Sequence, residues 1–345
     1  MADEPEIAYS KSAVAEPEIE AGESSEEAVK EPDESAAAEG DGVEAGCPVV
    51  MGYFAGLRCA RKLHVATDGV DEKSVCLMHS KDPGKQSGPL FDAFWLEFER
   101  ILEDAGEGEA HFESFVFPNL KFIRRRFQAI CRFDYATFTE GADFTNAAFT
   151  HNAYFRKAIF TQRAFFLYAT FAQGADFSGT TFTQNAVFGY ATFTQNAVFG
   201  WATFTQEAAF GHATFTQEAD FGCAIFARTA NFDSATFKQT AGFIVTKFHG
   251  TAFWHESRFL DRAEFRHTYF MPLVEGKPGA VFALAKFYKP GEIVFDDVDL
   301  SRALFLNCDV SQVCLPHLCV GEDGRTIAAS RFSMRSIISK DGPSN

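Results

Sequence analysis

The chain has 345 residues, of which 46% are apolar and 23% are charged, so it can bury a sizeable core in one or two domains. This composition excludes a wholly disordered or collagen-like chain. The formal net charge is −16, but residues 1–46 carry −13 of it, and the rest of the chain is close to neutral. The unusual figure is 41 Phe, more than a globular core needs, so we expect Phe to serve as a repeated unit.

Residues 1–46 are rich in Glu, Ala, Ser and Pro and nearly free of aromatic residues. Such a segment cannot bury enough surface to offset its ordering entropy, so a disordered acidic tail is expected. It has no basic start followed by an apolar run, and the chain has no run of about 18 apolar residues, so neither export nor a membrane span is supported. Eight Cys without an export signal favour a reducing compartment, and we expect a cytoplasmic protein.

Residues 47–86 contain a Cys/His pattern. Its spacing is C-x11-C-x16-C-x2-H, formed by Cys47, Cys59, Cys76 and His79. Zinc takes four thiolate or imidazole ligands in a tetrahedron. A module of about 35 residues with so few apolar residues needs a cross-link of this kind to fold stably. The sequence therefore predicts a small module with a structural zinc ion (Zn²⁺), which has no open position for catalysis. His64 is the alternative fourth ligand if His79 points away, and three free thiols beside a surface His are the simpler interpretation.

Residues 87–107 contain a predicted helix. Apolar residues recur at helical spacing between Leu90 and Ala105, with Pro89 before them and Gly106 after them. Since a solenoid exposes an open strand edge at each end, we expect this helix to cap the N-terminal end of the repeats that follow. The alternative is that the helix binds in a groove of another protein.

From Phe138 to Phe248 the spacing between Phe residues alternates between six and five, and Ala stands two residues before 19 of these 21 Phe. Only Thr180 and Thr246 replace the Ala. The A-x-F alternation has the period of a β-strand, so Ala and Phe point to the same side. Four such sides close a coil of 22 residues, in which Phe stacks on Phe at about 4.8 Å. A helical supercoil of the same period is disfavoured by the β-branched residues and Gly around each Phe.

This pattern resembles the pentapeptide-repeat proteins, in the subclass whose central residue is Phe rather than Leu. The resemblance implies an all-β solenoid, a right-handed quadrilateral β-helix, over residues 108–313 with 36 central positions in nine coils. The central positions outside the regular run are expected at Phe112, Phe117, Phe122, Phe127, Phe133, Phe253, Phe259, Phe265, Phe270, Phe282, Phe287, Phe295, Leu300, Phe305 and Val310. Residues 47–86 also resemble small Cys/His zinc-binding modules that precede the helix in some members of the subclass.

Residues 314–345 show no repeat and no strong helix, so an irregular tail is expected, and how the last coil is covered stays open. A second, weaker cluster consists of Cys308, Cys314, His317 and Cys319. Because Cys308 is expected to point inward as the small residue of a repeat, a metal is not the favoured interpretation there. The basic run from Arg124 to Arg126 is interpreted as a solvated corner.

No nucleophile, base and orienting residue stand together in the sequence, and no Gly-rich phosphate-binding loop is present, so no enzyme is expected. The leading hypothesis is a scaffold for protein-protein interaction with an unknown protein partner, no small-molecule substrate and no membrane contact. The near-neutral repeats also predict no direct nucleic-acid binding.

The family resemblance implies an alternative function, in which an acidic dimer imitates DNA and occupies a type II topoisomerase. A homodimer through one end or one flat face is expected only by that analogy. Such mimicry needs a dense negative surface, since duplex DNA carries a charge about every 1.7 Å. Between Phe133 and Phe270 there are 11 acidic and 9 basic residues, which disfavours it.

A distant third hypothesis is ice binding, because Thr-Phe-Thr recurs at 181–183, 192–194, 203–205 and 214–216. Copies 11 residues apart fall on opposite faces of the predicted coil, so each face holds only two adjacent rungs.

Overall fold

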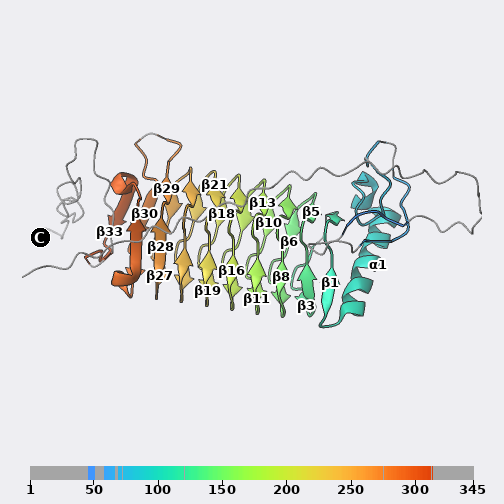
Figure 1. The fold of residues 1–345 in the computed structure, drawn as a ribbon, viewed down its shortest axis with the longest axis horizontal. Coiled ribbons are helices and arrows are strands. Elements are labelled where there is room, and N and C mark those ends of the chain that lie inside the picture. The colour runs from blue at the N-terminus through green and yellow to red at the C-terminus, as the bar shows by residue number, and fades with distance from the viewer. Residues whose placement is uncertain are drawn as a thin grey trace, which may run out of the picture. The chain divides into compact units, whose positions relative to one another are not determined.

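The computed structural model describes residues 46–50, 58–66, 69–71, 73–119, 121–274, 276–311 and 313. Their main body is a parallel β-solenoid, in which four sheets form the four sides of each coil (Figure 1). The predicted acidic tail and the predicted irregular tail lie outside the described residues, apart from Gly46. Cys314, His317 and Cys319 of the weaker cluster also lie outside them.

We number the sheets I to IV in the order in which the chain visits them within one coil. Sheet I contains β1 (Glu109–His111), β4 (Ile130–Arg132), β8 (Ala153–Tyr154), β12 (Ala175–Asp176), β16 (Ala197–Val198), β20 (Ala219–Asp220), β24 (Ala241–Gly242), β28 (Ala263–Arg266) and β32 (Ile293–Asp296). Sheet II contains β2 (Val116–Phe117), β5 (Thr137–Phe138), β9 (Ile159–Phe160), β13 (Thr181–Phe182), β17 (Thr203–Phe204), β21 (Ile225–Phe226), β25 (Lys247–Phe248) and β29 (Tyr269–Phe270).

Sheet III contains β6 (Ala142–Asp143), β10 (Ala164–Phe165), β14 (Ala186–Val187), β18 (Ala208–Ala209), β22 (Ala230–Asn231), β26 (Ala252–Phe253), β30 (Ala280–Ala283) and β33 (Ala303–Leu306). Sheet IV contains β3 (Arg126–Phe127), β7 (Ala148–Phe149), β11 (Thr170–Phe171), β15 (Thr192–Phe193), β19 (Thr214–Phe215), β23 (Thr236–Phe237), β27 (Arg258–Phe259) and β31 (Lys286–Phe287). The helices are α1 (Gly88–Ala105) and three short 3-10 helices, η1 (Pro83–Gln86), η2 (Pro290–Glu292) and η3 (Leu300–Arg302).

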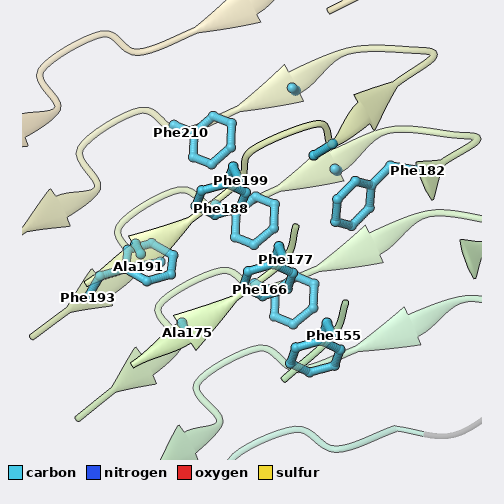
Figure 2. Packing of buried hydrophobic residues seen from close by; sticks show 14 of the residues in the cluster. Phe155, Phe166, Ala175, Phe177, Phe182, Phe188, Ala191, Phe193, Phe199 and Phe210 are labelled. Carbon is cyan, nitrogen blue, oxygen red and sulfur yellow. The ribbon is translucent and has the colours of Figure 1, made fainter. Parts of the chain in front are cut away.

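The stacked Phe rings form the core, as the sequence predicts (Figure 2). Phe193 lies between Phe171 and Phe215, with ring centroids 4.9 Å away on both sides and nearly parallel planes. Phe199 of the next side meets the Phe193 ring edge-on at 5.8 Å. Stacked and edge-on pairs at these spacings are both favourable for aromatic rings. Each ring therefore has aromatic neighbours above, below and beside it.

The small inward positions are buried, including the two that carry Thr instead of Ala. The Oγ1 of Thr180 donates to the carbonyl oxygen of Phe155, and that of Thr246 donates to Phe221, both at 2.7 Å. A buried hydroxyl is costly without a partner, so these two bonds explain why Thr is tolerated inside the coil.

One predicted central position is wrong. The prediction placed Phe253 in the core, but the buried residue is Trp254, and Phe253 faces outward, half-buried. Trp254 stacks on Phe232 at 5.4 Å and on Phe282 at 4.6 Å. The physical reason is that Ala252 takes the small inward position, so the residue two places later must point inward as well.

The solenoid resumes after the predicted break between Met271 and Gly279. Ala252 pairs with Ala280, 28 residues later, instead of the usual 22. Phe282, Phe287, Phe295 and Phe305 then continue the aromatic columns. With Leu300 buried and Val310 packed against the core, the described residues form about nine coils, as expected.

Helix α1 covers the N-terminal end of the aromatic core, as predicted. Phe98 stacks on Phe112 at 4.7 Å, and Phe94 meets Phe117 edge-on at 5.6 Å. The helix ends at Ala105 and is capped by Gly106, whose φ of 55° favours glycine and whose N–H donates to the carbonyl of Leu102. The rings of α1 thus occupy the place that a further coil would fill.

The interpretation of the basic run as a solvated corner is wrong for Arg125. Its guanidinium donates to both carboxylate oxygens of Glu99 on α1, at 2.6 and 2.5 Å. The guanidinium also lies about 5.5 Å from the ring centroids of Trp95, Phe98 and Phe127. A cation over aromatic faces is attracted by their quadrupoles, so Arg125 fastens α1 to the first coils.

Candidate metal centre

Two of the predicted ligands, Cys47 and Cys59, lie on neighbouring extended segments. The Cys47 N–H donates to the carbonyl of Arg61 at 2.8 Å, and the Cys59 N–H donates to that of Val49 at 2.9 Å. Gly46 packs so closely that a Cβ at this position would lie 2.7 Å from the carbonyl oxygen of Ala60. This close pairing brings the two thiols onto one side of the module.

The other two predicted ligands, Cys76 and His79, lie on a tight turn. The N–H groups of His79 and Ser80 both donate to the carbonyl of Cys76 at 3.0 Å. Asp71 supports the turn from outside, because it accepts hydrogen bonds from the Ser80 hydroxyl at 2.6 Å and from the Lys81 N–H at 2.8 Å. The turn holds both side chains on the same side, toward the paired segments.

The structure brings all four predicted ligand atoms together, within 4.8 Å of one another. The Sγ atoms of Cys59 and Cys76 are 3.6 Å apart, and the Nδ1 of His79 lies 3.5 Å from Cys47 Sγ and 3.2 Å from Cys76 Sγ. In a tetrahedral zinc site the edges are about 3.8 Å between sulfurs and about 3.6 Å between sulfur and nitrogen. The donor atoms and their spacing therefore fit a zinc site with three Cys ligands and one His ligand.

The orientation of His79 suits a metal ligand. Its Nε2 lies 3.2 Å from the carbonyl oxygen of Glu113, and its ring meets that of Phe115 edge-on at 5.2 Å. When Nε2 donates its proton to that carbonyl, the lone pair of Nδ1 faces the sulfur atoms. Such a second hydrogen bond commonly fixes the tautomer of a metal-binding His.

His64, the alternative fourth ligand, points elsewhere. Its Nε2 lies 3.1 Å from the Oδ2 of Asp82, and it does not belong to the group of four donor atoms. The structure thus brings His79, rather than His64, to the three Cys residues.

Two of the thiols differ strongly in proton affinity. The pKa of Cys59 is lowered, chiefly by its hydrogen bond with Cys76, and also by hydrogen bonds with His79 and Arg61, despite partial burial. The pKa of Cys76 is raised above its usual value, first by the same hydrogen bond and then by burial. The cluster therefore favours a thiolate at Cys59, the form that binds a metal.

The Cys/His module of residues 47–86, which we call the metal module, also contacts the first coil and α1 directly. The Val116 N–H at the open edge of β2 donates to the carbonyl of Met78 at 2.8 Å. The carbonyl of Val116 accepts from the ammonium of Lys85 at 2.6 Å, and Lys85 also donates to Leu77 at 3.0 Å. The turn between Cys76 and His79 thus satisfies the edge that would otherwise be open.

Arg61 links the ligands to the helix. It donates to Cys59 Sγ at 3.2 Å and to a carboxylate oxygen of Glu97 on α1 at 2.8 Å. Sequence reasoning missed Arg61, Lys85 and Glu113 as parts of this site, because their contacts depend on how the module sits on the coil. The only sequence signal is that Arg61 lies two residues after Cys59.

The remaining described cysteines have structural positions. Cys131 is a fully buried small residue, and burial raises its pKa. Cys223 lies at a corner with φ of 58°. Cys308 is half-buried, and its Sγ donates to the carbonyl of Phe282 at 2.6 Å, in agreement with its predicted inward position.

Among the described residues, no second group of His, Cys, Asp and Glu is arranged to hold a metal. No helix in the described part of the chain is long and apolar enough to cross a bilayer.

Comparison with known proteins identifies the repeats. A family model described as pentapeptide repeats (nine copies) matches residues 155–200 and, in an overlapping match, residues 177–222. No curated protein and no solved structure matches the chain significantly. The same strand register and Phe columns continue on both sides of the matched residues. Residues 155–222 therefore match the pentapeptide-repeat family, and the solenoid around them has a phenylalanine at the centre of nearly every repeat.

Proposed function

We propose that this protein is a non-enzymatic interaction scaffold whose N-terminal cap is fastened by one structural zinc ion. The observation that carries the metal assignment is the convergence of three thiols and one imidazole nitrogen within 4.8 Å. Cys47, Cys76 and His79 are at most 6% exposed, so the chain itself fills the coordination positions and shields them from solvent. A closed four-ligand site of this kind stabilises structure and leaves no position for a substrate.

The charges around the site support zinc. Zinc with three thiolates and one neutral imidazole carries a net charge of about −1. The Arg61 guanidinium, 3.2 Å from Cys59 Sγ, offsets that charge. Outer hydrogen bonds to ligands, such as those from Arg61 and to Glu113, commonly orient and tune a metal site.

Zinc would also stabilise the solenoid itself. The turn that carries Cys76 and His79 supplies the carbonyl that covers the Val116 N–H on β2. Because a metal that binds only the folded module stabilises every contact the module makes, its binding energy is shared with the first coil. The proposed role of the metal is therefore to close the N-terminal end of the solenoid.

The metal assignment is tested by elemental analysis of freshly purified protein. We expect one zinc per chain, and none after the double substitution Cys76→Ser, His79→Ala. His64→Ala and Cys223→Ser are the matched controls, because they remove an imidazole and a thiol outside the cluster, and both should retain the metal. The absence of zinc from the unchanged protein, or its loss in both controls, would refute the assignment.

The proposed partner is another protein, bound on the faces of the coil or through the metal module. The middle coils support this because their outward positions are mostly Thr, Gln, Asn and Gly, with few charges. Cross-linked pull-downs from native cells should compare the unchanged protein with the Cys76→Ser, His79→Ala variant. Partners lost in the variant would place recognition on the module, and partners retained would place it on the repeats. Retrieval of no specific protein by either form would contradict the scaffold role.

The alternative function, DNA mimicry at a type II topoisomerase, is less well supported. Several acidic groups on the solenoid are paired with Arg, as Asp134 is with Arg156 at 2.7 Å and Glu264 with Arg262 at 2.6 Å. Such pairing reduces the negative potential that mimicry needs. Inhibition of supercoiling that survives deletion of residues 1–46 would favour mimicry over the scaffold.

Ice binding is the least supported function. The Oγ1 atoms of Thr183 and Thr205 each donate to two backbone carbonyls of the preceding coil, at 2.7 and 3.0 Å. Part of the hydroxyl array is therefore engaged in holding the coils together. Thermal hysteresis in purified protein would reverse this ranking.

A further inference from the structure

Large apolar side chains gather on the surface of the last two coils. Leu304 and Leu306, on the outer face of β33, are 43% and 41% exposed. Leu284, at the corner after β30, and Tyr288, just after β31, are 40% and 58% exposed. We call these four residues the end patch. Apolar groups gathered in this way commonly mark a contact surface.

A loop extends the apolar surface. Met271, Leu273 and Val274 lie between β29 and β30 and are 44% to 59% exposed. Past these residues the chain is anchored, because the Gly279 N–H donates to the carbonyl of Arg302 at 2.8 Å. The loop therefore leads directly into the sheet that carries Leu304 and Leu306.

A cavity of about 480 Å³ adjoins the end patch. Its lining includes Leu284, Tyr288, Glu256, Arg258, Lys286 and Asp309. The two acidic and two basic side chains suit an occupant that brings both apolar groups and charges of both signs.

The end patch also lies beside open strand edges. β33 is the last described strand of sheet III, and β31 is the last of sheet IV. Unpaired edges beside exposed apolar residues invite association unless something covers them. At the N-terminal end, the carbonyl of Met78 accepts a hydrogen bond from the Val116 N–H on β2, but no described element covers the C-terminal edges of sheets III and IV.

We propose that residues 314–345 of this chain fold back and cover the end patch. Val313 packs against the core, so the chain continues into this segment at the same end of the solenoid. The segment has four basic and three acidic residues, which match the mixed lining of the cavity. Its large apolar residues are Leu315, Leu318, Val320, Ile327, Phe332, Met334, Ile337 and Ile338.

Covalent attachment favours this occupant over a separate molecule, because a tethered segment binds at a high effective concentration. Residues 1–46 do not compete for the site, since a segment with a net charge of −13 and few apolar residues suits an apolar patch poorly. The proposal concerns the opposite end from the metal centre and does not depend on zinc.

Limited trypsin digestion of the full chain, followed by mass spectrometry, tests the proposal. Arg325, Arg331 and Arg335 lie in the segment, and Lys30, in the acidic segment 1–46, is the internal reference. Cleavage after the three Arg residues should be at least about tenfold slower than cleavage after Lys30, because cleavage follows the population of the open form.

The double substitution Leu304→Asp, Leu306→Asp should bring cleavage of the segment close to the rate at Lys30. Ile159→Asp is the matched control, since Ile159 is 40% exposed on β9 in the N-terminal half of the solenoid, and it should leave the rate unchanged. If the double variant misfolds, Tyr288→Ser alone should still speed the cleavage.

Three results would overturn the proposal. One is cleavage of the segment as fast as at Lys30 in the unchanged protein. Another is slow cleavage that neither Leu304→Asp, Leu306→Asp nor Tyr288→Ser accelerates. The third is a dimer in sedimentation experiments that the substitutions at Leu304 and Leu306 convert to a monomer, because a second copy would then be the occupant.

Discussion

At the N-terminal end of the solenoid, Phe94 and Phe98 of α1 continue the aromatic core. The carbonyl of Met78 accepts a hydrogen bond from the Val116 N–H on the strand edge. At the C-terminal end, no described residue covers Leu304 and Leu306 of the last described coil, which are 43% and 41% exposed. Repeated coils can cover one another inside the solenoid, but the first and the last coil each have a neighbouring coil on one side only. Each rung relies on the next one, so the ends must be closed by segments of a different kind.

The largest expected effect compares aromatic rings at the two ends. Phe98→Ala should lower the free energy of unfolding by about 3 to 5 kcal/mol, because it removes a fully buried ring at the capped end. Phe305→Ala should cost about half as much, since Phe305 stacks on Phe282 at 4.9 Å and no described ring stacks on its other face. Denaturant unfolding measures both, and equal losses would show that the two ends are closed equally well.

A second prediction concerns Lys85, which is buried beneath the cap. Burial lowers its pKa to about 7, whereas an unfolded Lys keeps a value near 10.5. Between these values the unfolded state binds more protons, so the free energy of unfolding should rise with pH by up to about 1.4 kcal/mol per unit. Lys85→Met removes this contribution, so the difference between the two proteins should grow from pH 7 to pH 9. A constant difference would contradict the buried, weakly basic amine.

A third, smaller effect is expected at the contact between α1 and the first coils. Arg125→Ala should cost about 1 to 2 kcal/mol, because it removes a bidentate pair with Glu99 and the packing on Trp95. Arg100→Ala, on the exposed side of the same helix, should cause no measurable change. If thermal unfolding shows similar losses for both variants, Arg125 does not fasten the cap.

The smallest effect involves His111 on β1. Its pKa is raised, first by the hydrogen bond with Glu113 and then by the charges of Glu113 and Glu109, which together outweigh the opposing effect of burial. A raised pKa of His adds stability below its unfolded value near 6.5, and this is lost as pH rises through the folded value. His111→Gln should therefore flatten the pH dependence of unfolding above about pH 6.5. An unchanged profile would show that the pair contributes nothing.

The repeat made most of the fold predictable, because its period fixes which side chains point inward. The prediction that Phe253 is a central residue was wrong because it used the positions of Phe alone. The Ala252 position already indicated Trp254, the residue two places later. The four candidate ligands were also recognisable from residue type and spacing.

The contacts between the module, the helix and the coils could not be predicted from the sequence in the same way. The choice between His64 and His79 depends on the bonds of His64 with Asp82 and of His79 with Glu113. In the sequence, Arg125 is one of three consecutive Arg residues, and nothing there indicates its contact with Glu99 on α1. Such contacts lack a local period, so no repeat in the sequence marks them.

The most direct test is hydrogen-deuterium exchange of the full chain as purified and after treatment with a zinc chelator. Removal of the metal should speed exchange in α1 and at the Val116 amide on β2, while β30 to β33 at the opposite end should exchange as before. Unchanged exchange at the N-terminal end would contradict the claim that a metal closes this end of the solenoid.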